Sequence, residues 1–119
     1  MLRTRDGVNI AWASTGEGPP LVRASTWLTH LEHDWESPVW RHWIEFFAEH
    51  FELIRYDERG SGMSDWVVDD YSWPRWAEDF EAVVDAAGID TPFPILGISQ
   101  GGVAAVSYAV RYPERVSHL

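Results

Sequence analysis

The segment that most constrains this chain runs from Phe93 to Gly102 and reads FPILGISQGG. An apolar run ends in a Gly-x-Ser-x-Gly motif, and an apolar helix pattern follows at once. This order predicts a strand, a sharp turn that carries Ser99, and then a helix. The turn forces Ser99 into a strained backbone conformation, and side chains at 97 or 101 would collide with the neighbouring strand and helix. We therefore expect the turn to require glycine at Gly97 and at Gly101.

A turn of this kind raises the Ser99 hydroxyl above the sheet and leaves N–H groups of the helix start free beside it. The arrangement is a nucleophile elbow, and it suits chemistry in which negative charge develops on a substrate oxygen. Ser99 is therefore the candidate catalytic residue. The alternative is a tight strand-to-helix turn whose serine has no chemical role, because so short a motif also arises by chance.

Composition excludes several other classes of site. The 119 residues suffice for one domain with its own core, and 45% of them are hydrophobic, without an apolar run of membrane-spanning length. Cysteine is absent, which removes disulfides and thiolate chemistry. No apolar signal segment follows Met1, so the expected location is the cytoplasm. The net charge is −10 and every basic residue is arginine, so neither nucleic acid nor an anionic membrane surface is an expected partner.

Apolar periodicity predicts strands that alternate with helices. Strands are expected over 8–12, 21–24, 51–56 and 94–98, with the start of another at 116–119. One helix is expected to begin with Ser37 as its N-cap, and a second to run from Ser72 to Gly88. A third, over 100–112, is apolar nearly all round and is expected to be buried. This order is typical of a single α/β domain, residues 1–119, with a mainly parallel sheet.

Three loops of this domain follow strand ends, and we expect them to meet at one edge of the sheet. They are residues 25–37, residues 57–64 and the turn at Ser99. Ligands of such sheets bind at the carboxyl ends of the strands. Trp27, Trp35 and Trp66, three of eight tryptophans, fall in loop segments. They either line an apolar pocket mouth or pack beneath their own loops.

Three segments, in order, resemble those of the alpha/beta-hydrolase family. Residues 56–64 (YDERGSGMS) are similar to its D-x-R-G-x-G-x-S turn after the fourth strand, residues 97–102 to its elbow, and residues 108–116 to the segment before its sixth strand. The resemblance covers essentially the whole chain but only the N-terminal half of the family's fold. It implies the first part of an alpha/beta-hydrolase fold, with helices on both faces of the sheet, truncated before the later strands.

The resemblance also implies roles for individual residues. Ser99 matches the family's nucleophile, and the backbone N–H of Gln100 matches one oxyanion donor. The second donor belongs to the loop after the third strand, here near Thr26 and Trp27. Many members carry His-Gly at this point, where this chain has Ser25 and Thr26, so the shape of the loop is open. The turn over 57–64 is mainly architectural in the family.

A serine nucleophile also needs a base and a carboxylate, which in this family follow it along the chain. After Ser99 the only candidates are Glu114 and His118, and His118 is expected at the wrong end of the sheet. His30 and His33 lie nearer the rim but precede the serine. We therefore expect the acid and the base to lie outside this chain, and the chain to self-associate or to bind a complementary C-terminal portion, because an open apolar strand edge favours association.

Three functions follow as hypotheses. The first is a serine hydrolase that acts on a small apolar ester, lactone or related acyl substrate through an acyl-enzyme. The second is a non-catalytic hydrolase-like module for ligand binding or sensing. The third, a nucleotide-binding domain, is disfavoured because neither Gly-x-Gly-x-x-Gly nor Gly-Lys-Ser/Thr is present. No cofactor is expected, and the His30-x-x-His33-Asp34 pattern lacks a zinc-binding spacing and further ligands, so no metal is expected either.

Overall fold

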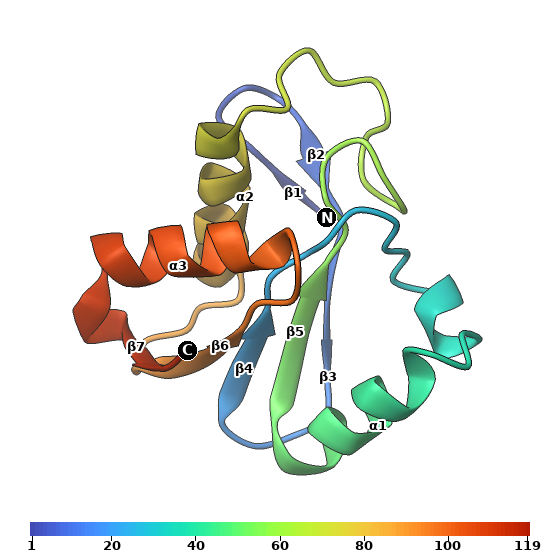
Figure 1. Ribbon diagram of the computed structural model, residues 1–119, viewed down its shortest axis with the longest axis vertical. Helices are drawn as coiled ribbons and strands as arrows, with labels where there is room; N and C mark the ends of the chain where they lie inside the picture. Colours follow the sequence, from blue (N-terminus) through green and yellow to red (C-terminus); the bar gives the residue numbers. More distant parts are fainter.

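The computed structural model describes residues 1–119 and is built around a five-stranded sheet (Figure 1). Its strands are Trp12–Thr15 (β3), Pro20–Arg23 (β4), Glu52–Tyr56 (β5), Phe93–Leu96 (β6) and Val116–His118 (β7). Their order across the sheet is β3-β5-β4-β6-β7. β3 pairs antiparallel with β5, and all other neighbours are parallel. The mainly parallel sheet that the sequence predicts is confirmed, and so is the strand that begins at Val116.

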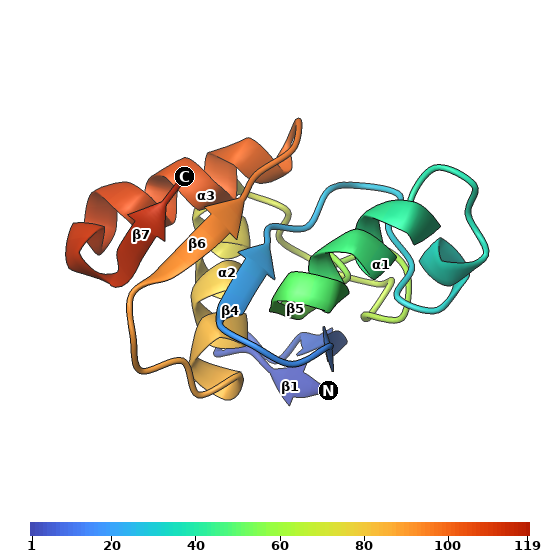
Figure 2. The ribbon, with the colours of Figure 1, turned by 90° about the horizontal axis from the view of Figure 1, so that it is seen from below.

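Helices cover both faces of this sheet, as expected (Figures 1 and 2). α1 (Arg41–His50) lies on one face, and α2 (Trp73–Ala86) and α3 (Gly101–Arg111) lie on the other. Successive strand residues point to opposite faces. Leu21 and Leu53 pack with Ile44 of α1, whereas Val22 and Ile54 belong to the larger core beneath α2 and α3.

The N-terminal region corrects one prediction. The strand expected over 8–12 is not continuous: β2 (Asn9–Ile10), which forms a hairpin with β1 (Leu2–Arg3), ends at Ile10, and β3 follows separately. The break falls at Ala11. Its N–H donates to Ser64 Oγ at 2.9 Å, and its carbonyl accepts from the Asp57 N–H at 2.9 Å. These bonds to the turn after β5 replace the ladder bonds of a continuous strand.

The predicted helix starts differ in detail from the observed ones. Ser37 Oγ accepts from the N–H groups of Val39 and Trp40 at 3.2 and 3.3 Å, but a turn intervenes and the regular α-helix begins at Arg41. Ser72 directly precedes α2, yet its side chain makes no capping bond. The remaining regular elements are two short 3₁₀ turns, His33–Trp35 (η1) and Pro113–Arg115 (η2).

The expectation that the third helix is buried all round is wrong. α3 buries the face that contains Ala104, Ala105 and Tyr108, whereas Val103, Val106 and Val110 are 42%, 51% and 74% exposed. Apolar composition predicted burial, but α3 packs mainly against α2, β6 and η2, and its outer valines remain at the surface. None of the helices combines the length and the apolar character needed to cross a lipid bilayer.

Arg23 lies in β4 at a position that is buried to 6% exposure, an unusual place for a guanidinium. Its Cζ atom lies 4.4 Å from the centroid of the Trp40 ring, and Nη1 lies 3.9 Å from Asp34 Oδ2. Arg55 of β5 lies 3.9 Å from the same oxygen. Burial is the main cause that lowers the pKa of both arginines and raises that of Asp34. This buried cluster anchors the 25–37 loop to the α1 face of the sheet.

Candidate active site

The turn between β6 and α3 has the strained geometry that its motif predicts. Ser99 is exposed and has φ = +53°, a left-handed conformation that costs a non-glycine residue about 1–2 kcal/mol. A Cβ atom on Gly97 would lie 2.9 Å from the Ala105 Cβ. One on Gly101 would lie 2.8 Å from the Ala24 carbonyl oxygen and 2.9 Å from that of Ser25. The predicted requirement for glycine at both positions is therefore confirmed.

The start of α3 leaves the Gln100 N–H, next to Ser99 in the chain, without an acceptor. The N–H groups of the three residues after Gln100 donate to the carbonyls of Ile98, Ser99 and Gln100, at 2.9, 3.0 and 3.1 Å. The Gln100 N–H donates to no group in the chain, and neither does the N–H of Trp27. Free N–H groups next to a serine hydroxyl are what the stabilisation of an oxyanion requires.

The three loops meet at one edge of the sheet, as the sequence predicts. Asp57 Oδ2 accepts from the Leu31 N–H at 3.0 Å and from the Met63 N–H at 2.8 Å, and so joins the 25–37 loop to the 57–64 turn. Gln100 at the elbow bonds to Glu58 of the same turn. These hydrogen bonds therefore join all three segments at the carboxyl end of the sheet.

The Arg59 side chain anchors the 57–64 turn to two neighbouring segments of the chain. Its Nε and Nη2 atoms donate to the two carboxylate oxygens of Asp79 on α2, each at 2.7 Å, and Nη1 lies 2.9 Å from Asp6 Oδ2. The hydrogen bond from Arg59 lowers the pKa of Asp6 well below its ordinary range. Arg59 is fully buried and reaches no open surface, so its contacts are those of a scaffold.

The comparisons with known proteins agree with this geometry. The profile of the alpha/beta hydrolase fold matches residues 25–119. The chain belongs to the alpha/beta hydrolase family. A hydrolase from Pseudomonas aeruginosa superposes with a TM-score of 0.81 at 30% identity, over 97% of this chain and 42% of that protein.

Two curated relatives show how varied the family's chemistry is. A bifunctional esterase/perhydrolase of Acinetobacter calcoaceticus is 30% identical over 92% of this chain and 38% of its own length. A cis-3-alkyl-4-alkyloxetan-2-one decarboxylase of Shewanella oneidensis is 28% identical over 98% of this chain and 36% of its own length. The chain therefore spans well under half the length of the curated relatives that it matches.

No histidine of this chain hydrogen-bonds to the Ser99 hydroxyl. His30 Nδ1 accepts from the backbone N–H groups of Glu32 and His33, which occupies that nitrogen locally. The His33 side chain is 71% exposed. His118 on β7 pairs with Pro94 of β6, which is five residues, or roughly 16 Å of extended chain, before Ser99. No group of three or more His, Asp and Glu side chains is placed to hold a metal ion.

The loop tryptophans differ in burial, and none of them lines one of the larger pockets. Trp35 packs against the smaller core under α1, whereas Trp27 and Trp66 are 62% and 71% exposed. Trp27 lies on the same loop as the proposed second oxyanion donor. None of the larger pockets includes Ser99 in its lining.

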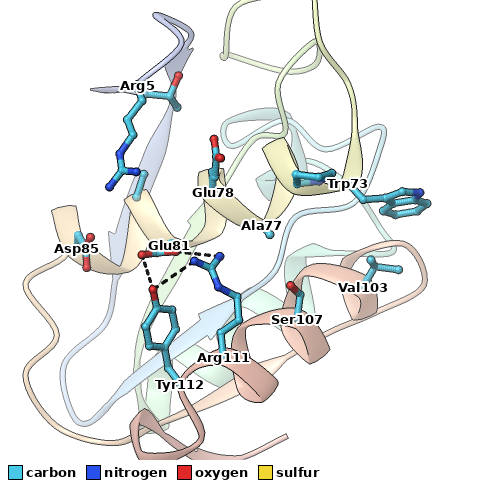
Figure 3. A pocket seen from close by; sticks show the side chains of 13 residues that line it. Arg5, Trp73, Ala77, Glu78, Glu81, Asp85, Val103, Ser107, Arg111 and Tyr112 are labelled. Atoms are coloured by element: carbon cyan, nitrogen blue, oxygen red, sulfur yellow. Dashed lines mark hydrogen bonds and ion pairs between the residues drawn. The ribbon is translucent and has the colours of Figure 1, made fainter.

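The most voluminous groove, about 580 Å³, lies between α2 and α3 and does not include Ser99 (Figure 3). Three of its polar side chains pair with one another. Tyr112 donates to Glu81 at 2.8 Å, and Arg111 lies 3.3 Å from the other carboxylate oxygen of Glu81. Acidic and basic side chains that are already paired offer little to a ligand, so this groove is not the candidate site.

Sequence reasoning missed Glu58 as part of the site. Glu58 is only 8% exposed, and both of its carboxylate oxygens lie 2.7 Å from Gln100 Nε2. Burial raises the pKa of the Glu58 carboxyl to about 7, with a contribution from Asp79, and the hydrogen bond from Gln100 opposes that rise. The available signal was an acidic residue directly after a buried strand, in a turn otherwise understood as architectural.

Proposed function

We propose that this chain supplies the nucleophile of an alpha/beta hydrolase that acts on a small apolar ester, lactone or related acyl substrate. The observation that carries the proposal is Ser99 itself, exposed and held at φ = +53° beside a free backbone N–H. Backbone strain at an exposed nucleophile is typical of a functional site, because the surrounding structure must maintain it at a cost. The esterase among the relatives is consistent with acyl chemistry.

In the proposed reaction, Ser99 Oγ attacks the substrate carbonyl and its proton passes to a general base. The carbonyl oxygen gains negative charge, which the N–H of Gln100 and a backbone N–H of Thr26 or Trp27 stabilise. The base then protonates the leaving alkoxide, and an acyl-enzyme on Ser99 remains until water hydrolyses it. The base and its orienting carboxylate lie outside these 119 residues in this proposal, since no histidine here bonds to Ser99.

Labelling with a fluorophosphonate, read by intact mass and peptide mapping, tests the role of Ser99. We expect imidazole, added as an external base, to accelerate modification of the peptide that contains Ser99. Ser99→Ala should abolish the label, whereas Ser117→Ala, at an exposed serine of β7, should leave it unchanged. A folded chain that takes no label even with imidazole, or a label that persists in Ser99→Ala, contradicts the proposal.

The exposed apolar surfaces support a second element of the proposal, association with a second copy or with a complementary C-terminal portion. Val103, Val106 and Val110 form an outward apolar face on α3, and the three-residue strand β7 is an unprotected sheet edge. Size-exclusion chromatography with light scattering should give a mass that rises with concentration, or that increases when the complementary portion is added. A monomer mass that stays constant in both experiments contradicts association.

A further inference from the structure

A partly buried contact joins the turn after β5 to the start of α3. Gln100 Nε2 donates to both carboxylate oxygens of Glu58, each at 2.7 Å, although the two residues are 42 positions apart in sequence. Gln100 is the N-cap residue of α3, but its side chain makes no capping bond to the helix. Its amide therefore serves the contact with Glu58 instead of the local backbone.

The same residue carries the free backbone N–H beside Ser99. Contacts of the neighbouring backbone restrict the conformation of the chain at Gln100. Gly101 lies against the carbonyl oxygens of Ala24 and Ser25, and the Gly101 N–H is bonded to the Ile98 carbonyl at 2.9 Å. With the side chain of Gln100 also held, the orientation of its peptide N–H is fixed by contacts on both the backbone and the side chain.

We propose that Glu58 is a positioning residue, which holds the Gln100 side chain and thereby fixes the Gln100 N–H for the charge that develops at the substrate oxygen. The catalytic relevance of this positioning role of Glu58 rests on the proposed function of Ser99. The link between Glu58 and the Gln100 peptide is a property of the fold and can be tested without catalysis.

The surroundings make the contact sensitive to pH near neutrality. Tyr56 from β5 and Asp79 from α2 are the other titratable groups that line the small cavity around Glu58 and Gln100. Asp79 is bound to Arg59, and burial raises the pKa of Tyr56 far above neutral pH. The pKa of Glu58 is raised to about 7, mainly by burial, so the carboxylate that accepts from Gln100 is lost as the pH falls below that value. Glu58→Gln keeps an acceptor for Gln100 but removes this titration.

The first experiment follows the backbone and side-chain amide signals of Gln100 by NMR between pH 5.5 and 8.5. In the wild-type chain we expect both signals to shift with one midpoint near the pKa of Glu58, about 7. In Glu58→Gln the titration should vanish and the signals should stay close to one end point. Glu58→Ala should displace the Gln100 backbone N–H signal at every pH. Signals that do not titrate in the wild type, or a backbone N–H unmoved in Glu58→Ala, overturn the proposal.

The second experiment measures the rate of fluorophosphonate labelling of Ser99 with imidazole present. We expect Glu58→Ala to slow it about tenfold or more through loss of donor alignment, and Glu58→Gln to restore it to within about threefold of wild type. Equal rates in Glu58→Ala and wild type overturn the positioning role. A wild-type chain without any label refutes the proposed function of Ser99 instead, and the NMR result then decides the Glu58–Gln100 link by itself. Removal of a carboxylate whose charge is disfavoured by burial should not unfold the chain, and circular dichroism checks this for both variants.

Discussion

Two adjacent glycines at the start of α3 allow the packing of the elbow to be tested with one matched pair of variants. Gly101→Ala would place a Cβ atom 2.8 Å from the Ala24 carbonyl oxygen and 2.9 Å from that of Ser25. Both neighbours are backbone atoms at the end of β4, so they cannot rotate away as a side chain could. Gly102→Ala, one residue later in the same helix, meets no atom within 4 Å.

The expected effects on the free energy of unfolding have opposite signs. Overpacking against a rigid neighbour costs about 1–3 kcal/mol, and replacing glycine by alanine within a helix returns about 0.5–1 kcal/mol. Gly101→Ala should therefore lose roughly 1–2 kcal/mol, whereas Gly102→Ala should gain up to about 1 kcal/mol. The two variants then differ by roughly 2 kcal/mol, or about 8 °C in Tm for a chain of this size.

Urea unfolding followed by tryptophan fluorescence, together with thermal unfolding, gives both quantities. The packing argument fails if Gly101→Ala is as stable as wild type, because the carbonyls of Ala24 and Ser25 would then have moved without cost. It also fails if the two alanine variants shift stability in the same direction by similar amounts. In that case helix propensity alone would account for both.

The remaining predictions concern the scaffold and the strain. Arg59→Ala leaves the Asp79 carboxylate buried without its partner and should cost about 3–5 kcal/mol in urea unfolding, whereas Arg41→Ala, at an exposed ion pair, should leave the midpoint unchanged. Arg59 holds the pKa of Asp6 below its ordinary 3.8, so Asp6 contributes stability that is present above that pH and lost as the pH falls. Asp6→Asn should therefore be less stable than wild type at pH 7, and a difference that persists undiminished near pH 2 contradicts this. Ser99→Gly should be more stable than Ser99→Ala by about 1 kcal/mol in thermal unfolding, since glycine adopts φ = +53° without strain; equal stability would mean that no strain is stored there.

Much of this fold could be predicted because local sequence and tertiary structure agree. The apolar strands, the alternation of helices between them and the glycine requirement at Gly97 and Gly101 each depend on neighbours in the sequence or on a single sharp turn. The same holds for the end of α2, which Gly88 closes at φ = +69°. The turn at Ser99 could be predicted from its motif and from the strand and helix that flank it.

The errors arose where a partner distant in sequence decides the outcome. The strand expected over 8–12 is broken because Ser64, 53 residues away, takes the Ala11 N–H. Composition alone predicts that the outward valines of α3 are buried. Their exposure, however, depends on which elements lie against the helix. Glu58 was overlooked for the same reason. Its role follows from its contact with Gln100, 42 positions later, and the sequence between them carries no pattern that joins the two.

These long-range contacts also explain how the strained backbone of Ser99 is maintained at the carboxyl end of the sheet. Ala24 at the end of β4 donates its N–H to the Leu96 carbonyl at 2.9 Å and presents its own carbonyl to Gly101. The backbone at Ala24 thus contacts both the strand before the elbow and the helix after it. The same segment leads directly into the loop that contains Thr26 and Trp27. A displacement of that stretch would move the proposed second oxyanion donor and the turn of Ser99 together. The proposed nucleophile and the proposed oxyanion donors therefore depend on the same short backbone segment.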